Sequence, residues 1–228
     1  ARSSCPHCTH VLAWHDLVPL LSFVLLRGKC RYCKKQISWQ YPIVEISTAL
    51  IFLLIFNFQF LIFNQFSIFQ FFKLFYLWVI ASLLIVIFVY DLKHYLIPDR
   101  IVYFGIVIAF FWSLNHWNLI ENWKLEIGNF LPTLFFLAIY LISRGRWMGF
   151  GDVKLALFMG LFLGWPNILV ALFLAFLLGA IIGVALVALK KKGLKSEVPF
   201  GPFLVTGTFL ALLWGESMVQ WYWNRFLI

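Results

Sequence analysis

The sequence has 228 residues, of which 63% are hydrophobic and only 12% are charged. A soluble globular domain is about half apolar and about a quarter charged, so this composition excludes that class and indicates a membrane protein. In a soluble protein the net charge of +9 would suggest nucleic acid as a partner. Here the positions of the basic residues along the chain explain the charge better, and no nucleic-acid partner is expected.

Residues 1–42 are polar enough to lie outside the bilayer, whereas the rest of the chain alternates long apolar runs with short polar breaks. A helix needs about 20 apolar residues to cross a bilayer, and fewer where other protein shields its ends. We therefore predict an all-α polytopic membrane protein with a small cytoplasmic domain over residues 1–42 and a transmembrane domain over residues 43–228. About seven transmembrane helices are expected, over residues 43–63, 71–90, 101–116, 129–143, 153–164, 167–189 and 202–222.

The fourth and fifth predicted helices are short, and they flank a glycine-rich break at residues 145–151. Short or interrupted helices are tolerated at membrane depth where they line a cavity. A further break, Gly164-Trp165-Pro166-Asn167, is typical of a tight turn between two helices.

The basic residues are distributed unequally between the two sides of the predicted membrane domain. With the N-terminal domain in the cytoplasm, 15 of the 18 lysine and arginine residues fall on the cytoplasmic side. Only Lys73, Lys124 and Arg225 fall on the other side. Cytoplasmic loops of membrane proteins carry such an excess, and one missed helix would scramble it. The cytoplasmic residues are Arg2, Arg27, Lys29, Arg31, Lys34, Lys35, Lys93, Arg100, Arg144, Arg146, Lys154, Lys190, Lys191, Lys192 and Lys195.

Two of the nine acidic residues lie at the ends of apolar runs. Asp91 follows the run 83–90, and Asp152 begins another span directly after Gly149-Phe150-Gly151. In the predicted topology both lie at the cytoplasmic edge of the bilayer, where an ionisable residue is costly and therefore a functional candidate. Two carboxyl groups held close together at low dielectric share one proton. Such a pair provides a general base for water and a general acid for a peptide carbonyl.

Three nearby residues are candidates for supporting the aspartates. Gly149 and Gly151 lack side chains and would let backbone or substrate approach the carboxylate of Asp152. Lys154 could tune the pKa of Asp152, bind a lipid phosphate, or extend its charge to the surface. The aspartates also have a structural interpretation, in which Asp91 anchors a helix end and Asp152 is a helix N-cap.

All four cysteines lie in the predicted cytoplasmic domain, as Cys5-x-x-Cys8 and Cys30-x-x-Cys33. Paired thiolates at this spacing are typical of tetrahedral zinc sites. A cytoplasmic location disfavours disulfide bonds, and a domain of about 40 residues has too little core to stand alone. We predict a zinc-ribbon-like domain with a structural zinc ion bound by these four residues. A thiol-oxidoreductase pair, or a histidine ligand from His7 or His10, is the alternative.

Several blocks of the sequence, in the same order, resemble a known family. Asp91-Leu92-Lys93-His94-Tyr95-Leu96-Ile97-Pro98-Asp99 resembles its first active-site motif, and Gly149-Phe150-Gly151-Asp152 its second. The remaining blocks are residues 2–8, 26–33, 41–45 and 199–203, the last reading Pro199-Phe200-Gly201-Pro202-Phe203. The chain is similar to the prepilin peptidases, also called type IV leader peptidases. The first transmembrane helix of that family does not precede these blocks, and we expect the chain to be truncated there.

The resemblance implies a membrane aspartyl endopeptidase of the bacterial inner membrane. Its members remove the short basic leader from type IV prepilins and pseudopilins at the cytoplasmic face, cleaving after a glycine. The two motif aspartates correspond to Asp91 and Asp152. Asp99, the rival of Asp91, follows Pro98 and is interpreted as a structural N-cap at the start of the next span.

The resemblance also implies a second activity. Many members methylate the new N-terminus with S-adenosylmethionine, although some are peptidases only. Gly28 and Lys29 match a motif linked to methylation, and Glu45, just inside the first span, is a further candidate for the S-adenosylmethionine site. A turn at Gly28 and a solvated charge at Lys29 explain these two residues equally well.

Two other functions fit parts of the sequence. An intramembrane protease of the presenilin or signal-peptide-peptidase kind would also carry Tyr90-Asp91 and Gly-Phe-Gly-Asp152. Such enzymes have a Pro-Ala-Leu motif where this chain has residues 199–202, and they lack the cysteine domain. A transporter or assembly scaffold would use the boundary aspartates to bind cations.

Overall fold

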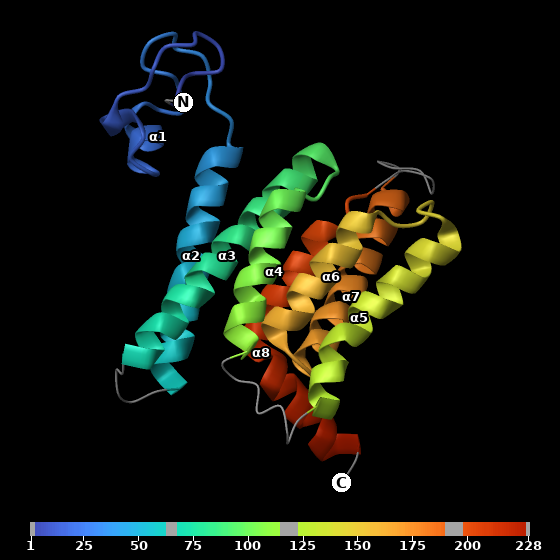
Figure 1. The fold of residues 1–228 in the computed structure, drawn as a ribbon. Helices are drawn as coiled ribbons and strands as arrows, with labels where there is room; N and C mark the ends of the chain where they lie inside the picture. The colour runs from blue at the N-terminus through green and yellow to red at the C-terminus, as the bar shows by residue number, and fades with distance from the viewer. Residues whose placement is uncertain (1–2, 63–67, 115–122, 190–197, 227–228) are drawn as a thin grey trace. The chain divides into compact units, whose positions relative to one another are not determined.

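The computed structural model describes residues 3–62, 68–114, 123–189 and 198–226. Over these ranges the chain is helical, with two isolated β-bridges and no strands. The chain divides into two compact units, Ala1–Trp78 and Val79–Ile228. The elements in chain order are the 3-10 helix η1 (Trp14–Asp16), α1 (Leu21–Leu25), α2 (Gln40–Ile62), α3 (Ile68–His94), α4 (Asp99–Leu114), α5 (Trp123–Ser143), α6 (Phe150–Leu163), α7 (Asn167–Ala188) and α8 (Gly201–Phe226) (Figure 1).

Each predicted transmembrane segment coincides with one of the helices α2 to α8. By length and composition, α2, α3, α7 and α8 can cross a membrane, whereas the apolar part of α5, Gly128–Ser143, is shorter. The helices α4 and α6 have 16 and 14 residues. The prediction of an all-α multi-pass membrane protein is confirmed, and the number of seven spans stays a prediction.

Some details of the prediction fall outside the described residues. These are the helix ends placed at residues 63 and 116, and the basic residues Arg2, Lys190, Lys191, Lys192 and Lys195. Elsewhere most helices exceed their predicted lengths, whereas α7 ends one residue earlier than predicted. The helix α3 continues to His94, so Asp91 lies within its last turn instead of following its end.

In the first unit, α2 and the beginning of α3 contact each other through aromatic side chains. The indole Nε1 of Trp78 donates a hydrogen bond of 3.3 Å to the carbonyl of Phe52, and the two rings stack with centroids 5.5 Å apart. Before α2, each pair of cysteines forms a turn closed by one β-bridge, Ser4 with Val11 and Lys29 with Gln36.

The second unit is organised around α6, which packs against α4, α5, α7 and α8. A helix that is apolar on all sides has to be covered on all sides, and seven of the 14 residues of α6 are buried. Small residues allow its neighbours to approach. At Gly160 a Cβ atom would collide with the backbone carbonyl of Asn129 in α5, and at Gly105 in α4 it would lie 2.6 Å from the ring of Phe158.

The predicted turn after α6 is present. The helix ends at Leu163, Gly164 adopts a positive φ of 70°, and α7 begins at Asn167. The backbone N–H of Trp165 donates a hydrogen bond of 2.6 Å to the side-chain oxygen of Asn129. This bond attaches the turn to α5.

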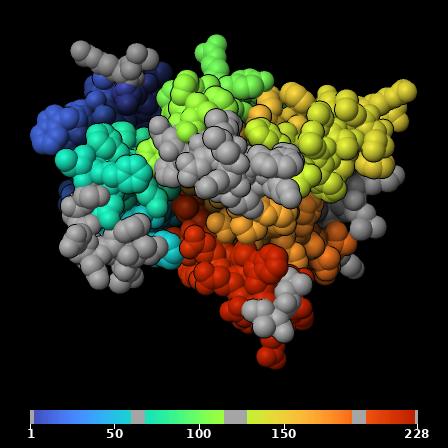
Figure 2. Space-filling model, turned by 60° about the horizontal axis from the view of Figure 1, so that its bottom comes forward, coloured from blue at the N-terminus to red at the C-terminus, as the bar shows by residue number. Residues whose placement is uncertain are grey.

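The most extensive helix contact is between α7 and α8, which lie side by side in orange and red (Figure 2). Their backbones approach closely at Gly207. A Cβ atom at this position would overlap the carbonyl oxygen of Ala171 and lie 3.2 Å from the Cβ of Ala175. Membrane helices commonly pack through small residues in this way, because apolar lipid does not drive them together.

We expect Gly207→Ala to lower the free energy of unfolding by about 1–3 kcal/mol, because the added methyl group forces α7 and α8 apart. Gly183→Ala is the matched control, since a Cβ atom there would have no neighbour within 4 Å. That change should be neutral or stabilising by up to about 1 kcal/mol through helix propensity. Unfolding of the purified protein in detergent measures both values, and equal effects would contradict the close contact.

Candidate functional site

Asp91 lies in the last turn of α3 and is buried, with 4% of its surface exposed. The helix ends three residues later, at His94. Its carbonyl accepts a hydrogen bond of 2.8 Å from the N–H of Tyr95, which has a positive φ of 56°. The carboxyl group is thus carried by a helix end, and the segment that follows it turns back toward α4.

The first residue of α8, Gly201, faces the Asp91 carboxyl group. A Cβ atom at Gly201 would lie 2.5 Å from Oδ2 and 3.2 Å from Cγ of Asp91, so only glycine fits here. The backbone N–H of Gly201 donates a hydrogen bond to this carboxyl group. The first N–H groups of a helix have no partners within the helix, and α8 therefore presents a free donor to Asp91.

Sequence reasoning assigned no role to Gly201. The available signal was a glycine between Phe200 and Pro202 at the start of an apolar run. The structure also shows what holds this segment in place. The ring of Phe200 packs against the rings of Phe136 in α5 and Phe176 in α7, with centroids 6.3 and 5.2 Å away.

Asp152 lies in the first turn of α6. The N-cap of this helix is Gly149, so the interpretation of Asp152 as the N-cap is wrong. The N–H of Asp152 donates a hydrogen bond of 3.2 Å to the carbonyl of Gly149. Its carboxyl group interacts electrostatically with that of Asp91. The second unit thus brings together two carboxyl groups, one from the end of α3 and one from the start of α6.

The two glycines before Asp152 have different surroundings. A Cβ atom at Gly149 would be 3.9 Å from Oδ2 of Asp152, an ordinary contact. A Cβ atom at Gly151 would be only 3.0 Å from the Cβ of Ile97. Close approach therefore requires glycine at position 151, and the approaching group is the segment between α3 and α4.

Lys154 pairs with Asp99 at the start of α4 through Nζ and Oδ1. The lysine side chain is only 11% exposed, and Nζ lies 5.4 and 5.3 Å from the ring centroids of Tyr103 and Phe150. The interpretation of Lys154 as a surface-extended lysine is therefore wrong. Asp99 is the first residue of α4 and Pro98 precedes the helix, so the interpretation of Asp99 as the N-cap is wrong. Its carboxylate instead links α4 to α6.

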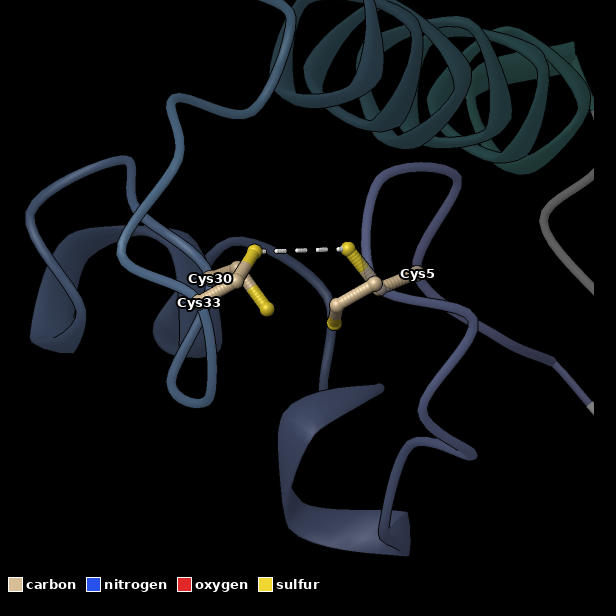
Figure 3. A group of neighbouring side chains, drawn as sticks. Cys5, Cys30 and Cys33 are labelled. Atoms are coloured by element: carbon tan, nitrogen blue, oxygen red, sulfur yellow. Dashed lines mark hydrogen bonds between the residues drawn. The ribbon is translucent and has the colours of Figure 1, made fainter.

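The four cysteines come together in the first unit, and their sulfur atoms all lie within 4.8 Å of one another. The sulfurs of Cys5 and Cys33 are 3.9 Å apart (Figure 3). Four sulfurs at about 2.3 Å from a zinc ion are separated by about 3.8 Å, so the cluster has the dimensions of a tetrahedral site. All four are free thiols, and in the described ranges no histidine belongs to the cluster.

The two cysteine pairs have the same local backbone. In the first, Thr9 donates its N–H to the carbonyl of Cys5 at 2.9 Å, and in the second Lys34 donates to Cys30 at 3.0 Å. Both donors have positive φ, 55° for Thr9 and 59° for Lys34. The same turn used twice presents two pairs of sulfur atoms to one point.

The ionisation of the thiols agrees with a cation at this point. Backbone hydrogen bonds from Cys8 and His7 lower the pKa of Cys5 to about 6. A backbone hydrogen bond from His10 acts to lower the pKa of Cys8, but burial and the neighbouring Cys5 and Cys33 outweigh it and raise the value to about 11. Four thiolates this close repel one another unless a bound cation neutralises them.

Among residues 3–39 only Cys5 and Cys30 are buried, so the cluster is the core of this domain.

Asp16, which sequence reasoning missed, connects the two cysteine pairs. Its side chain is 3% exposed and accepts hydrogen bonds from Arg31 at 2.7 Å and from the N–H of Ala13 at 3.3 Å. Burial acts to raise the pKa of Asp16, but these bonds and the charge of Arg31 outweigh it and lower the pKa below its usual value. An acidic residue between the two pairs was the only available signal.

The three residues predicted to bind S-adenosylmethionine also lie in the first unit. Gly28 has a positive φ of 69°, and a Cβ atom there would be 3.1 Å from the ring of Phe23. Lys29 forms the β-bridge with Gln36. The carboxylate of Glu45 accepts a hydrogen bond of 2.8 Å from the N–H of Leu20. Each has a structural contact within the unit.

Fold and site together define an integral membrane protein with a pair of carboxyl groups at helix ends and a domain built on four cysteines. Residues 1–59 match the sequence model described as the bacterial peptidase A24 N-terminal domain, and residues 78–184 match that of the type IV leader peptidase family. The chain belongs to the type IV leader peptidase family.

The similar curated proteins carry the name prepilin leader peptidase/N-methyltransferase. The protein from Aeromonas hydrophila is 32% identical over 234 residues, which cover 99% of this chain and 76% of that protein. The protein from Bacillus subtilis (strain 168) is 33% identical over 221 residues, covering 97% and 85% of the two chains. No solved structure matches significantly.

We expect the reduced protein to contain about one zinc ion per chain, measured by elemental analysis. Cys30→Ser should remove the metal and expose residues 3–39 to proteolysis, because structural zinc sites supply much of the folding free energy of small domains. His7→Ala is the control and should keep the metal. Reduced wild-type protein without bound metal would contradict this prediction.

Proposed function

We propose that this protein is a membrane aspartyl endopeptidase that removes the basic leader from type IV prepilins and pseudopilins, cleaving after a glycine. Asp91 and Asp152 are its catalytic residues. The observation that carries this proposal is that two carboxyl groups, presented by the end of α3 and the start of α6, lie near enough to interact electrostatically. A carboxyl pair held this way is what peptide hydrolysis by an aspartic protease needs.

In the proposed reaction one carboxylate removes a proton from water, and the oxygen of that water attacks the carbonyl carbon of the scissile bond. The other carboxyl group donates its proton to the carbonyl oxygen. The C–N bond then breaks, and the departing amine takes up a proton. Gly201 supports this chemistry by holding the Asp91 carboxyl group with its backbone N–H.

We assign the protein to the bacterial inner membrane, with the cysteine domain and both aspartates on the cytoplasmic side. The excess of lysine and arginine in the loops on that side supports this orientation. The end of α3 and the beginnings of α4, α6 and α8 are adjacent through the contacts of Asp91 with Gly201 and of Lys154 with Asp99. The proposed site is thus at one face of the helical unit, where a leader in the cytoplasm could reach it.

Zinc is the proposed metal of the cysteine cluster, with Cys5, Cys8, Cys30 and Cys33 as ligands. Four thiolates in tetrahedral arrangement suit zinc, which would supply structural support and no redox chemistry. The thiol-oxidoreductase alternative is disfavoured because all four sulfurs converge on one point. Membrane lipid is the remaining proposed partner, and the exposed apolar surface of α2 and α7 supports it.

A second proposed activity is methylation of the new N-terminus, favoured by the names of the similar proteins. The methyl group would pass from the sulfonium of S-adenosylmethionine to the free amine, with release of a proton. Gly28, Lys29 and Glu45 remain the proposed S-adenosylmethionine residues. All three belong to the first unit, Ala1–Trp78.

The peptidase is tested with purified protein in detergent and a type IV prepilin, by following the shortened product. Asp91→Asn and Asp152→Asn should each reduce kcat by at least about 10²-fold, because each removes one partner of the proton transfers. Glu216→Gln, the same chemical change at an exposed carboxylate of α8, should leave cleavage unchanged. Normal cleavage by either aspartate variant would refute the pair as the catalytic site.

For methylation, transfer of a labelled methyl group from S-adenosylmethionine to the cleaved pilin is measured. Glu45→Gln should reduce it about tenfold, as expected for losing a hydrogen bond to a charged group. Cleavage by the same variant should stay within about twofold, because Glu45 has no proposed role in the proton transfers and its carboxylate bonds to Leu20 within the first unit. Equal losses of both activities would show that Glu45 serves the fold and not methyl transfer.

A further inference from the structure

Ile97, in the segment between α3 and α4, contacts the glycines beside both proposed catalytic residues. Its Cβ lies 3.0 Å from where a Cβ of Gly151 would be, next to Asp152 in the chain. Its Cδ1 lies 3.4 Å from where a Cβ of Gly201 would be, and that same point is 2.5 Å from Oδ2 of Asp91. One side chain therefore extends from the start of α6 to the start of α8, alongside the two carboxyl groups.

The segment that carries Ile97 is fixed at both ends. On one side the N–H of Tyr95 bonds to the carbonyl of Asp91. On the other, Pro98 follows directly, restricting Ile97 to extended backbone conformations, and the carbonyl of Pro98 accepts bonds from Ile101 and Val102.

The ion pair of Asp99 with Lys154 then attaches the same segment to α6. Lys154 is itself held between the rings of Tyr103 and Phe150. With a fixed backbone and contacts at both glycines, Ile97 has little freedom to move aside. A substrate side chain that extends into the space occupied by Ile97 would clash with it sterically.

We propose that Ile97 determines specificity, by restricting the residue before the scissile bond to glycine. This inference rests on the proposed peptidase function. The scissile bond has to reach both carboxyl groups, and the enzyme's own residues beside Ile97 already lack a Cβ. A substrate Cβ at this place would compete with the isoleucine side chain, whereas glycine would not. Exclusion by a fixed group is an effective form of selection, because it penalises the wrong substrate without binding the right one more tightly.

The test compares two prepilins that differ only in having glycine or alanine before the cleavage site. The measured quantity is the ratio of kcat/KM for the alanine substrate to that for the glycine substrate, which does not depend on the fraction of active enzyme. Ile97→Ala should raise this ratio at least about tenfold, the effect of one methyl group in a tight site. Ile97→Val should give an intermediate value. Leu96→Ala, at the exposed neighbouring residue, should leave the ratio as in the wild type.

The outcomes separate this inference from the proposed function. If the wild type fails to cleave the glycine substrate, the proposed function fails, and the role of Ile97 fails with it. If the wild type cleaves and neither Ile97 variant changes the ratio, the role of Ile97 alone is refuted. The same conclusion holds if Leu96→Ala raises the ratio as much as Ile97→Ala, or if Ile97→Ala loses activity and Ile97→Val keeps the wild-type ratio.

Discussion

Close approach of helix backbones around α6 is the constraint on which the second unit depends. Apolar side chains gain little by moving from lipid to a helix interface, so the helices need direct contact between their surfaces. Glycine and alanine provide it at Gly160 against α5, at Gly105 against Phe158, and at Gly207 between α7 and α8. With α6 covered by four helices, its first turn is fixed in space, and so is Asp152.

The proposed site continues this packing to the helix ends. Gly201 allows α8 to begin directly at the carboxyl group of Asp91, and Gly151 allows Ile97 to lie on the start of α6. The aromatic contacts of Phe200 hold α8 from the other side. The ionisable groups at these helix ends have polar partners within the protein. Lys154 pairs with Asp99, and Asp91 has a backbone donor.

Periodicity and composition were sufficient to predict the helices, because a bilayer imposes length and apolarity on each segment. They could not predict that α3 continues past Asp91, since Lys93 and His94 interrupt the apolar pattern. The cysteine spacing predicted the cluster, because pairs of thiols with this spacing have few other uses.

Gly201 and Ile97 could not be identified from the sequence as neighbours of the aspartates. Their importance comes from distances between segments far apart in the chain, and neither residue type is reactive. The partner of Lys154 could not be predicted for a similar reason, as Asp99 lies on another helix.

The cysteine domain has a different basis of stability from the helices. Over residues 3–39 the buried hydrophobic residues are two cysteines, while Trp14, Val24 and Leu25 remain largely exposed. Hydrophobic burial therefore contributes little, and a metal ion bound by the four cysteines would take the place of a core. With such a metal the cysteine domain would depend on the supply of metal to the cell, whereas the helices of the second unit pack without one. In a cell short of that metal, the helical unit would assemble while the cysteine domain stayed unfolded, and the two proposed activities would then be lost at different metal concentrations.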